Sequence, residues 1–367
     1  MKNNKFYLNG VSYSPKKVLI IAELGTSHGA DPVKAEELIE AAFEAGADCI
    51  KFQIVYAREI LHPNTGEVLL PGGKTRLYDK FLDLECPPSF YAKMKELVEK
   101  KGLIFLCTPF GLKSARELYD LKPKCIKIAS PELNYTGLLS EIASYNLPTL
   151  LSTGVSKLGD IEEALSILGN VCLLHCVTSY PAPEREYNLS VIKSLNAIFG
   201  LPVGVSDHSL DPLLVPALAI TQGAAVIEKH FCLSRNDPGL DDPIALPPDS
   251  FAKMVSLIRH IEKISPEEAI EALCRERGRD LVMGVLGNGI KALAPSEKAN
   301  YERTNRSVHA LREIREGEII TEDMIACLRT EKKLRPGMAP AWEKLIPGRR
   351  ARCFIPDGEG IRFEDLG

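Results

Sequence analysis

The stretch Val203-Gly204-Val205-Ser206-Asp207-His208, with Val226-Ile227-Glu228-Lys229-His230 after it, contains the strongest indication of the fold. Each is an apolar run that ends in charged residues and a histidine, and the two histidines are 22 positions apart (208 and 230). That spacing is about one strand-helix-strand step. Because consecutive strands of a parallel barrel end at the same rim, the two imidazoles should lie side by side there, as a metal site or an acid/base pair.

Apolar runs of this kind recur from residue 18 to residue 232, and they predict eight strands. The runs are 18–25, 47–54, 103–110, 125–132, 147–154, 171–178, 203–209 and 224–232. Continuous apolar runs indicate strands buried on both faces of a parallel sheet. Helix-like stretches such as 33–45 and 89–101 separate them, each followed by glycine. We therefore predict an α/β fold, a (β/α)8 or TIM barrel, with a doubly wound open sheet as the alternative.

The chain is longer than one core usually holds, so we expect a second, smaller domain. Residues 1–264 should form the barrel, 265–298 a linker and 299–367 a β-rich unit. In that unit the segments around Gly317 and Gly358 echo each other, which predicts two copies of strand, turn and short helix. The segment 54–87 is rich in Pro and Gly and should be an insertion over the barrel mouth, of undetermined role.

Composition excludes several classes of function. The net charge is −4 and there is no basic block, so nucleic acid is not expected as a partner. No run approaches the roughly 20 apolar residues of a membrane span, and no signal-type stretch follows Met1, so we expect a cytoplasmic protein without a membrane partner. The 10 cysteines form no C-x-x-C pair, and we expect buried free thiols rather than disulfides.

Chemistry-bearing residues gather at the predicted strand ends. Lys51 and Lys127 lie within apolar strands, where an ammonium group needs an anionic partner. Internal glutamates would supply it, or a ligand that carries phosphate and carboxylate groups. Four hydroxyl side chains on neighbouring strand ends could donate to such a ligand: Thr108, Ser130, Ser152 and Ser206.

His208 and His230 fit a divalent metal with open positions, which is the arrangement of a catalytic site. A structural pair satisfied by the backbone is the alternative. The ligand set leaves Mn, Mg, Co and Zn open. His175 is less suited as a third ligand, because a single histidine inside an apolar strand is more often a core residue.

Beyond these separate features, the order of the motifs resembles the sialic acid synthase family, the nonulosonate synthases. The matching stretches lie at 21–25, 47–53, 107–110, 127–132, 151–154, 174–176, 206–208 and 227–231. The tail resembles the family's antifreeze-like (SAF, β-clip) domain through Asn305-Arg306-Ser307-Val308 and Arg335-Pro336-Gly337.

The resemblance implies a transferase that joins phosphoenolpyruvate to an N-acylated hexosamine such as N-acetylmannosamine, with water, and releases phosphate. It implies catalytic roles for Glu23, Lys51, Lys127, His208 and His230, the two histidines holding a metal, usually Mn²⁺, with Mg²⁺ or Co²⁺ possible. Phosphoenolpyruvate would contact Lys51, Gln53, Thr108, Lys127, Ser130, Ser152 and Ser206. The sugar would contact Tyr180, Glu132, Glu228, Asp241 and either Arg329 or Arg335. It also implies a domain-swapped homodimer in which the small domain of one subunit caps the barrel of the other.

The chain departs from the family pattern at Ser27, at Pro131 and in the loop 237–242. All but Pro131 lie where the sugar is expected. The acceptor therefore stays open among N-acetylmannosamine, its 6-phosphate, and a di-N-acetylated deoxyhexose leading to legionaminic or pseudaminic acid. A non-catalytic sugar-phosphate-binding barrel and an aldolase with a Schiff base on Lys127 are the rival hypotheses.

Overall fold

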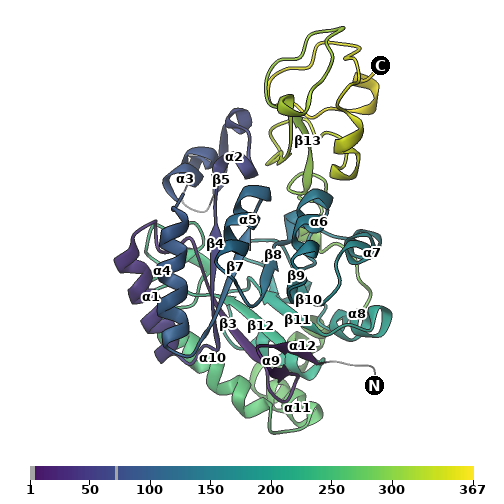
Figure 1. Cartoon of the computed structure of the whole chain (residues 1–367). Helices are drawn as coiled ribbons and strands as arrows, with labels where there is room; N and C mark the ends of the chain where they lie inside the picture. Colours follow the sequence, from purple (N-terminus) through teal and green to yellow (C-terminus); the bar gives the residue numbers. More distant parts are fainter. Residues whose placement is uncertain (1–4, 71–72) are drawn as a thin grey trace.

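A computed structural model describes residues 5–70 and 73–367 and contains a parallel barrel of eight strands (Figure 1). Around the barrel the strand order is β7-β4-β3-β12-β11-β10-β9-β8, and the two end strands lie against each other, so that the barrel is nearly closed. All eight predicted strands are confirmed, and the open-sheet alternative is wrong. They are β3 (Leu19–Gly25), β4 (Cys49–Ile54), β7 (Ile104–Pro109), β8 (Ile126–Ile128), β9 (Thr149–Ser152), β10 (Val171–Cys176), β11 (Val203–Asp207) and β12 (Val226–His230).

Helices surround the barrel, and α1 (Pro32–Glu44) shows how the sequence specifies them. Its N-cap Asp31 accepts from the backbone N–H of Val33, and Pro32 occupies the first turn, where its missing N–H costs nothing. The helix buries one face against the strands. The other helices of the shell are α4 (Pro88–Lys100), α5 (Leu112–Asp120), α6 (Thr136–Ser144), α7 (Leu158–Ile167), α8 (Val191–Phe199), α9 (Leu214–Thr221) and α10 (Pro248–Ile261).

The inside of the barrel has an apolar lower layer and a polar upper layer. Side chains two positions apart on a strand share a face, so Ile21 lies below Glu23 and Leu150 lies below Ser152. A hairpin that the sequence did not reveal, β1 (Phe6–Leu8) with β2 (Val11–Tyr13), packs onto the lower layer. It covers the amino-terminal end of the barrel, and the polar layer faces the opposite end.

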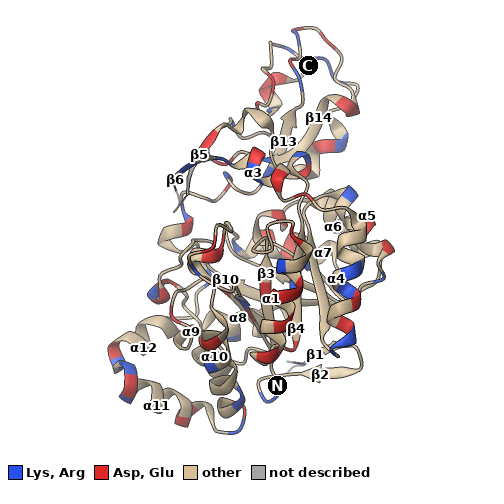
Figure 2. Cartoon of the chain, turned by 90° about the vertical axis from the view of Figure 1, so that its left-hand side faces the viewer, with Lys and Arg blue, Asp and Glu red and all other residues tan. Residues whose placement is uncertain are grey.

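The insertion lies at the carboxyl end of the barrel, as predicted, beside the small domain (Figures 1 and 2). It has its own hydrophobic cluster, which includes Ile60, Leu61, Val68, Leu77 and Tyr78. Its elements are α2 (Ala57–Ile60), the 3-10 helix η1 (Pro63–Thr65), the hairpin β5 (Glu67–Leu70) and β6 (Gly73–Arg76), and α3 (Leu77–Asp83).

The segment 265–298 differs from the predicted linker, because α11 (Pro266–Arg277) and α12 (Arg279–Leu286) pack on α9. Ser265 and Glu268 form a capping box that starts α11, and each helix buries apolar side chains. Only the part after Gly287 is an irregular connection, with the 3-10 turn η5 (Pro295–Glu297). Acidic and basic residues lie side by side on α11 and α12 (Figure 2).

The small domain pairs β13 (Arg306–Ala310) with β14 (Ile325–Arg329). The internal echo is confirmed: Ile314 of one copy pairs with Ile355 of the other, and a 3-10 helix follows each glycine turn. These short helices are η6 (Glu322–Met324) and η8 (Phe363–Asp365), with η7 (Pro340–Leu345) between them.

The ten cysteines are free, as predicted, and all but Cys274 and Cys353 are buried. A search of the described residues finds no helix with the length and apolar character needed to span a membrane.

Candidate active site

A cavity of about 770 Å³ opens at the carboxyl end of the barrel, where pockets of ~300–1,000 Å³ typically hold small ligands. Barrel strand ends form its floor, and the insertion and the small domain form its sides. It brings together most of the predicted site residues: Glu23, Lys51, Gln53, Thr108, Lys127, Ser130, Ser152, Tyr180, Ser206, His208, Glu228, His230, Asp241 and Arg329.

Two lysines and two glutamates form a buried ionic cluster on the floor. Lys51 Nζ lies 2.9 Å from Glu23 Oε2 and 3.7 Å from Glu228 Oε1, and Lys127 Nζ lies 3.7 Å from Glu228 Oε1. The internal-glutamate alternative is therefore present in this structure. Burial raises the pKa of Glu23, whereas Lys127 and Lys51 outweigh the effect of burial and lower the pKa of Glu228. Lys51 and Lys127 thus place two ammonium groups at the floor, which suits an anionic ligand.

Hydroxyl groups extend this cluster around the floor. Lys127 Nζ donates to Ser152 Oγ over 2.7 Å, and Lys51 Nζ donates to Thr108 Oγ1 over 3.2 Å. Ser206 Oγ donates to Glu228 Oε1 over 2.9 Å, and Gln53 Nε2 donates to Glu23 Oε1 over 2.6 Å. The same amino and hydroxyl groups could donate to a phosphate or carboxylate in place of their internal acceptors.

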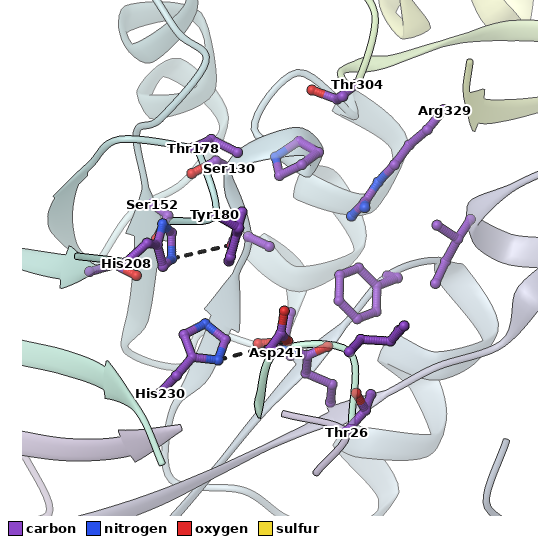
Figure 3. Close-up of a pocket in the computed structure, with 18 of the residues that line it drawn as sticks. Thr26, Ser130, Ser152, Thr178, Tyr180, His208, His230, Asp241, Thr304 and Arg329 are labelled. Carbon is purple, nitrogen blue, oxygen red and sulfur yellow. Dashed lines mark hydrogen bonds and ion pairs between the residues drawn. The ribbon is translucent and has the colours of Figure 1, made fainter. Parts of the chain in front are cut away.

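His208 and His230 lie side by side, as predicted, with ring centroids 5.5 Å apart (Figure 3). His208 Nδ1 donates to the Val177 carbonyl over 2.9 Å, and its Nε2 lies 3.2 Å from the Tyr180 hydroxyl. Cys176 outweighs the effect of burial and raises the pKa of His208 to about 9. Burial lowers the pKa of His230 well below its ordinary value, so this ring is neutral. Its Nδ1 is 3.8 Å from Asp241 Oδ2.

These groups fit a divalent cation with open coordination positions. His230 and, once it gives up its Nε2 proton, His208 would supply two nitrogen donors, and the carbonyl bond of His208 fixes its tautomer as a metal ligand requires. Within residues 5–70 and 73–367, no group of three or more His, Cys, Asp or Glu side chains is arranged to hold a metal. Water or substrate would complete the coordination. His175 lies on the outer face of β10, where Nε2 bonds to the Tyr187 carbonyl.

Glu132 joins the barrel to the small domain. Its Oε1 lies 3.0 Å from Arg306 Nε and 2.6 Å from Arg329 Nη2, and all three side chains are largely buried. Arg329 reaches the pocket, and Figure 3 shows its guanidinium group on the side opposite His230. Glu132 does not line the pocket. In place of the predicted contact with the sugar it makes a contact with Arg329, which does line the pocket.

Of the two candidate arginines, Arg329 lines the pocket and Arg335 does not. Its Nη2 bonds to Asp365 Oδ2 over 2.7 Å and to the Gly360 carbonyl over 2.7 Å, within the small domain. Between the two arginines, Glu331, Lys332 and Lys333 line the pocket, and the chain leaves it after them. The small domain lies over the barrel of its own chain, so a swapped dimer stays a prediction.

Two of the family departures, Ser27 and the loop 237–242, meet at one side of the pocket. Ser27 donates to Asp242 of the loop 237–242, and Asp242 also accepts from the backbone N–H of Gly239 over 2.8 Å. Leu240 and Asp241 of that loop line the pocket, as does Pro131.

Sequence reasoning missed Thr26, Asn300, Thr304 and Arg306. The first three line the pocket from loops whose direction no periodicity reveals. Arg306 carried a usable signal, since a buried arginine inside an apolar strand needs a carboxylate partner.

Comparisons with known proteins agree with this geometry. Residues 38–269 match the model of the NeuB family, and residues 305–367 match the SAF domain. N,N'-diacetyllegionaminic acid synthase of Campylobacter jejuni is 35% identical over 86% of this chain and 91% of its own length. An uncharacterized protein of Methanocaldococcus jannaschii is 34% identical over 95% of this chain and 94% of its own length.

Among solved structures, the crystal structure of the spore coat polysaccharide biosynthesis protein SpsE from Bacillus subtilis has a TM-score of 0.82. It is 32% identical, with 99% of both chains covered. The fold, the order of the domains and these matches lead to one conclusion: the chain belongs to the NeuB family of nonulosonic acid synthases and carries a C-terminal SAF domain.

Proposed function

We propose that this protein condenses phosphoenolpyruvate with the open-chain aldehyde of an N-acyl hexosamine and releases phosphate. One observation carries the proposal. A single pocket holds a lysine and hydroxyl cluster for an anion and, beside it, a pair of histidines for a metal. These are the two halves that this reaction requires, since one substrate is a phosphate and carboxylate anion and the other is an electrophilic carbonyl.

The chemistry balances without a redox partner. C3 of the enolpyruvate attacks the aldehyde carbon and forms the C–C bond, while the aldehyde oxygen takes up a proton from solvent, which the water that adds to C2 returns through Glu23. Water adds to C2, and the C2–O bond breaks to release inorganic phosphate and leave a 2-keto acid. A bound divalent cation supplies Lewis-acid polarisation of the aldehyde oxygen. Lys51 and Lys127 stabilise charge on the departing phosphate. Glu23, beside Lys51, positions the attacking water and accepts its proton.

The test is phosphate release with each substrate alone and with both, for N-acetylmannosamine, its 6-phosphate and a di-N-acetylated deoxyhexose. We expect release only with both substrates, abolished by a chelator and restored by Mn²⁺. His208→Ala should lose this metal-dependent release while it keeps the circular dichroism of the fold. If no acceptor supports phosphoenolpyruvate-dependent release in the presence of Mn²⁺, Mg²⁺ or Co²⁺, the proposal is wrong.

We also propose that the protein is a homodimer in which the contact between Glu132 and Arg329 forms between two chains. Domain exchange keeps the same interface and changes only which chain supplies it. Exposed apolar side chains on the small domain offer further surface to a partner, among them Trp342, Leu345, Phe354 and Phe363.

A further inference from the structure

One wall of the pocket is apolar, and the insertion 54–87 supplies most of it. Val68 of β5 is 9% exposed and Leu77 of α3 is 8% exposed, and both line the cavity. The whole wall consists of Val55, Ile60, Val68, Leu77 and Phe81, with Phe110, Ala129 and Leu240 next to them. These side chains belong to a hydrophobic cluster separate from the barrel core. The wall therefore has support of its own and does not depend on a ligand to hold its shape.

One charged group reaches this wall, because the Arg329 guanidinium lies 5.2 Å from the centroid of the Phe110 ring. The lysines and histidines are on the barrel floor, and Arg329 and the exposed Lys332 and Lys333 approach from the small domain. A sugar hydroxyl pressed against the wall would lose its water without gaining a hydrogen bond, which is unfavourable. A methyl group in the same place would be favoured by burial of apolar surface.

We propose that the insertion forms an apolar subsite that selects an acceptor with a methyl-bearing substituent, a deoxy or additionally N-acylated sugar, over a hydroxylated or phosphorylated one. This inference rests on the proposed function and names its substrate class. It also gives the insertion a role: selection of the acceptor.

The experiment compares four acceptors in the presence of phosphoenolpyruvate and Mn²⁺. They are N-acetylmannosamine, its 6-deoxy analogue, the analogue with a second acetamido group at C4, and the 6-phosphate. We expect kcat/KM for at least one methyl-bearing analogue to exceed that of N-acetylmannosamine by about 10- to 200-fold, the range for one apolar group in a pocket. The two analogues distinguish a subsite for the C6 methyl from one for a second acyl group.

Val68→Thr then tests the wall itself, because it adds a hydroxyl with little change of shape. The ratio of kcat/KM between the favoured analogue and N-acetylmannosamine should fall by about tenfold. Since both sugars are measured with the same variant, a partial loss of folded protein cancels from the ratio. Val98→Thr, at a buried position of α4 outside the pocket, should leave the ratio unchanged.

Equal or higher kcat/KM for N-acetylmannosamine or its 6-phosphate would overturn the inference, as would an unchanged ratio in Val68→Thr. Calorimetric affinities for the same four sugars separate this outcome from a failure of the proposed function. A methyl preference in binding without phosphate release would support the subsite and refute the synthase. Phosphate release with no methyl preference would support the synthase and refute the subsite.

Discussion

Glu132 shows how one side chain can position another across a domain boundary. Its Oε1 bonds to Arg306 and Arg329, and Arg306 also donates to backbone carbonyls, including that of Phe110 over 2.6 Å. Arg329 is thereby held with its guanidinium group at the pocket. Removal of one partner from a buried ion pair leaves an uncompensated charge, and the penalty for that charge exceeds the net gain of the pair.

Glu132→Gln should lower the free energy of unfolding by about 3–5 kcal/mol, measured by urea denaturation. The KM for the acceptor should rise because Arg329 loses its anchor. Glu271→Gln, which removes an exposed ion pair with Arg279 on the outer helices, is the matched control and should leave the urea midpoint unchanged. Equal midpoints for the two variants would contradict the positioning role.

Lys127→Met should lower kcat/KM by about 10²–10³-fold, the effect of losing one preorganised charge-stabilising donor. The variant keeps the length of the side chain, and Glu228 keeps Lys51 as a partner at 3.7 Å. Lys16→Met, at an exposed position before β3, controls for a change of net charge. An unaltered kcat/KM in Lys127→Met would show that this lysine serves only its internal glutamate.

At the scale of elements, the barrel strands place the site residues correctly only if each strand keeps its register with its neighbours. Gly204 in β11 illustrates the constraint: a Cβ there would lie 2.4 Å from the Val226 carbonyl oxygen and 2.8 Å from Leu174 Cδ2. Two positions further along the same strand face is Ser206, which lines the pocket. The close approach of neighbouring strands thus sets the position of functional groups.

Gly204→Ala should destabilise the protein by about 1–3 kcal/mol through overpacking of the barrel, as measured by thermal or urea unfolding. Gly159→Ala in α7 is the control, because nothing lies within 4 Å of its added Cβ. Alanine at position 159 restricts the backbone of the unfolded chain, so the free energy of unfolding should rise by up to about 1 kcal/mol. The two substitutions should therefore have opposite signs, and a shared sign would contradict this account.

At the scale of the whole molecule, the small domain caps either the barrel of its own chain or the barrel of a partner chain. If the small domains are exchanged, a mixed dimer of Lys127→Ala and Arg329→Ala chains contains one barrel with both residues intact. We expect each variant to be nearly inactive alone, and activity to appear after the two are unfolded and refolded together. No recovery in refolded mixtures, with dimers present by sedimentation, would assign Arg329 to the barrel of its own chain.

Acid stability also belongs to this scale, since buried histidines in both domains contribute to it. Burial lowers the pKa of His28 to about 4, of His175 to about 3 and of His309 to about 4. Below the ordinary value of 6.5 the unfolded chain takes up protons that the folded chain refuses. Each of these histidines therefore makes unfolding easier as the pH falls from 6.5 towards its folded pKa.

His309→Asn tests this linkage in the small domain. The free energy of unfolding should fall less steeply between pH 6.5 and pH 4 than in the unaltered protein, by up to about 1.4 kcal/mol per pH unit. His260→Asn, at an exposed position of α10, should leave the slope unchanged. The same slope in all three proteins would contradict the prediction.

The amino-acid sequence by itself determined the eight strands, the internal echo of the small domain and most of the pocket floor. Local patterns suffice there, because apolar runs specify buried strands and parallel strands end at one rim. Only the tertiary structure showed that Arg329 rather than Arg335 lines the pocket, that Glu132 does not line it, and that 265–286 packs on the barrel. It also showed which apolar side chains of the insertion face the pocket. These outcomes depend on contacts between segments that are not neighbours in the chain, such as Glu132 with Arg306, and no local periodicity encodes which of these surfaces will meet.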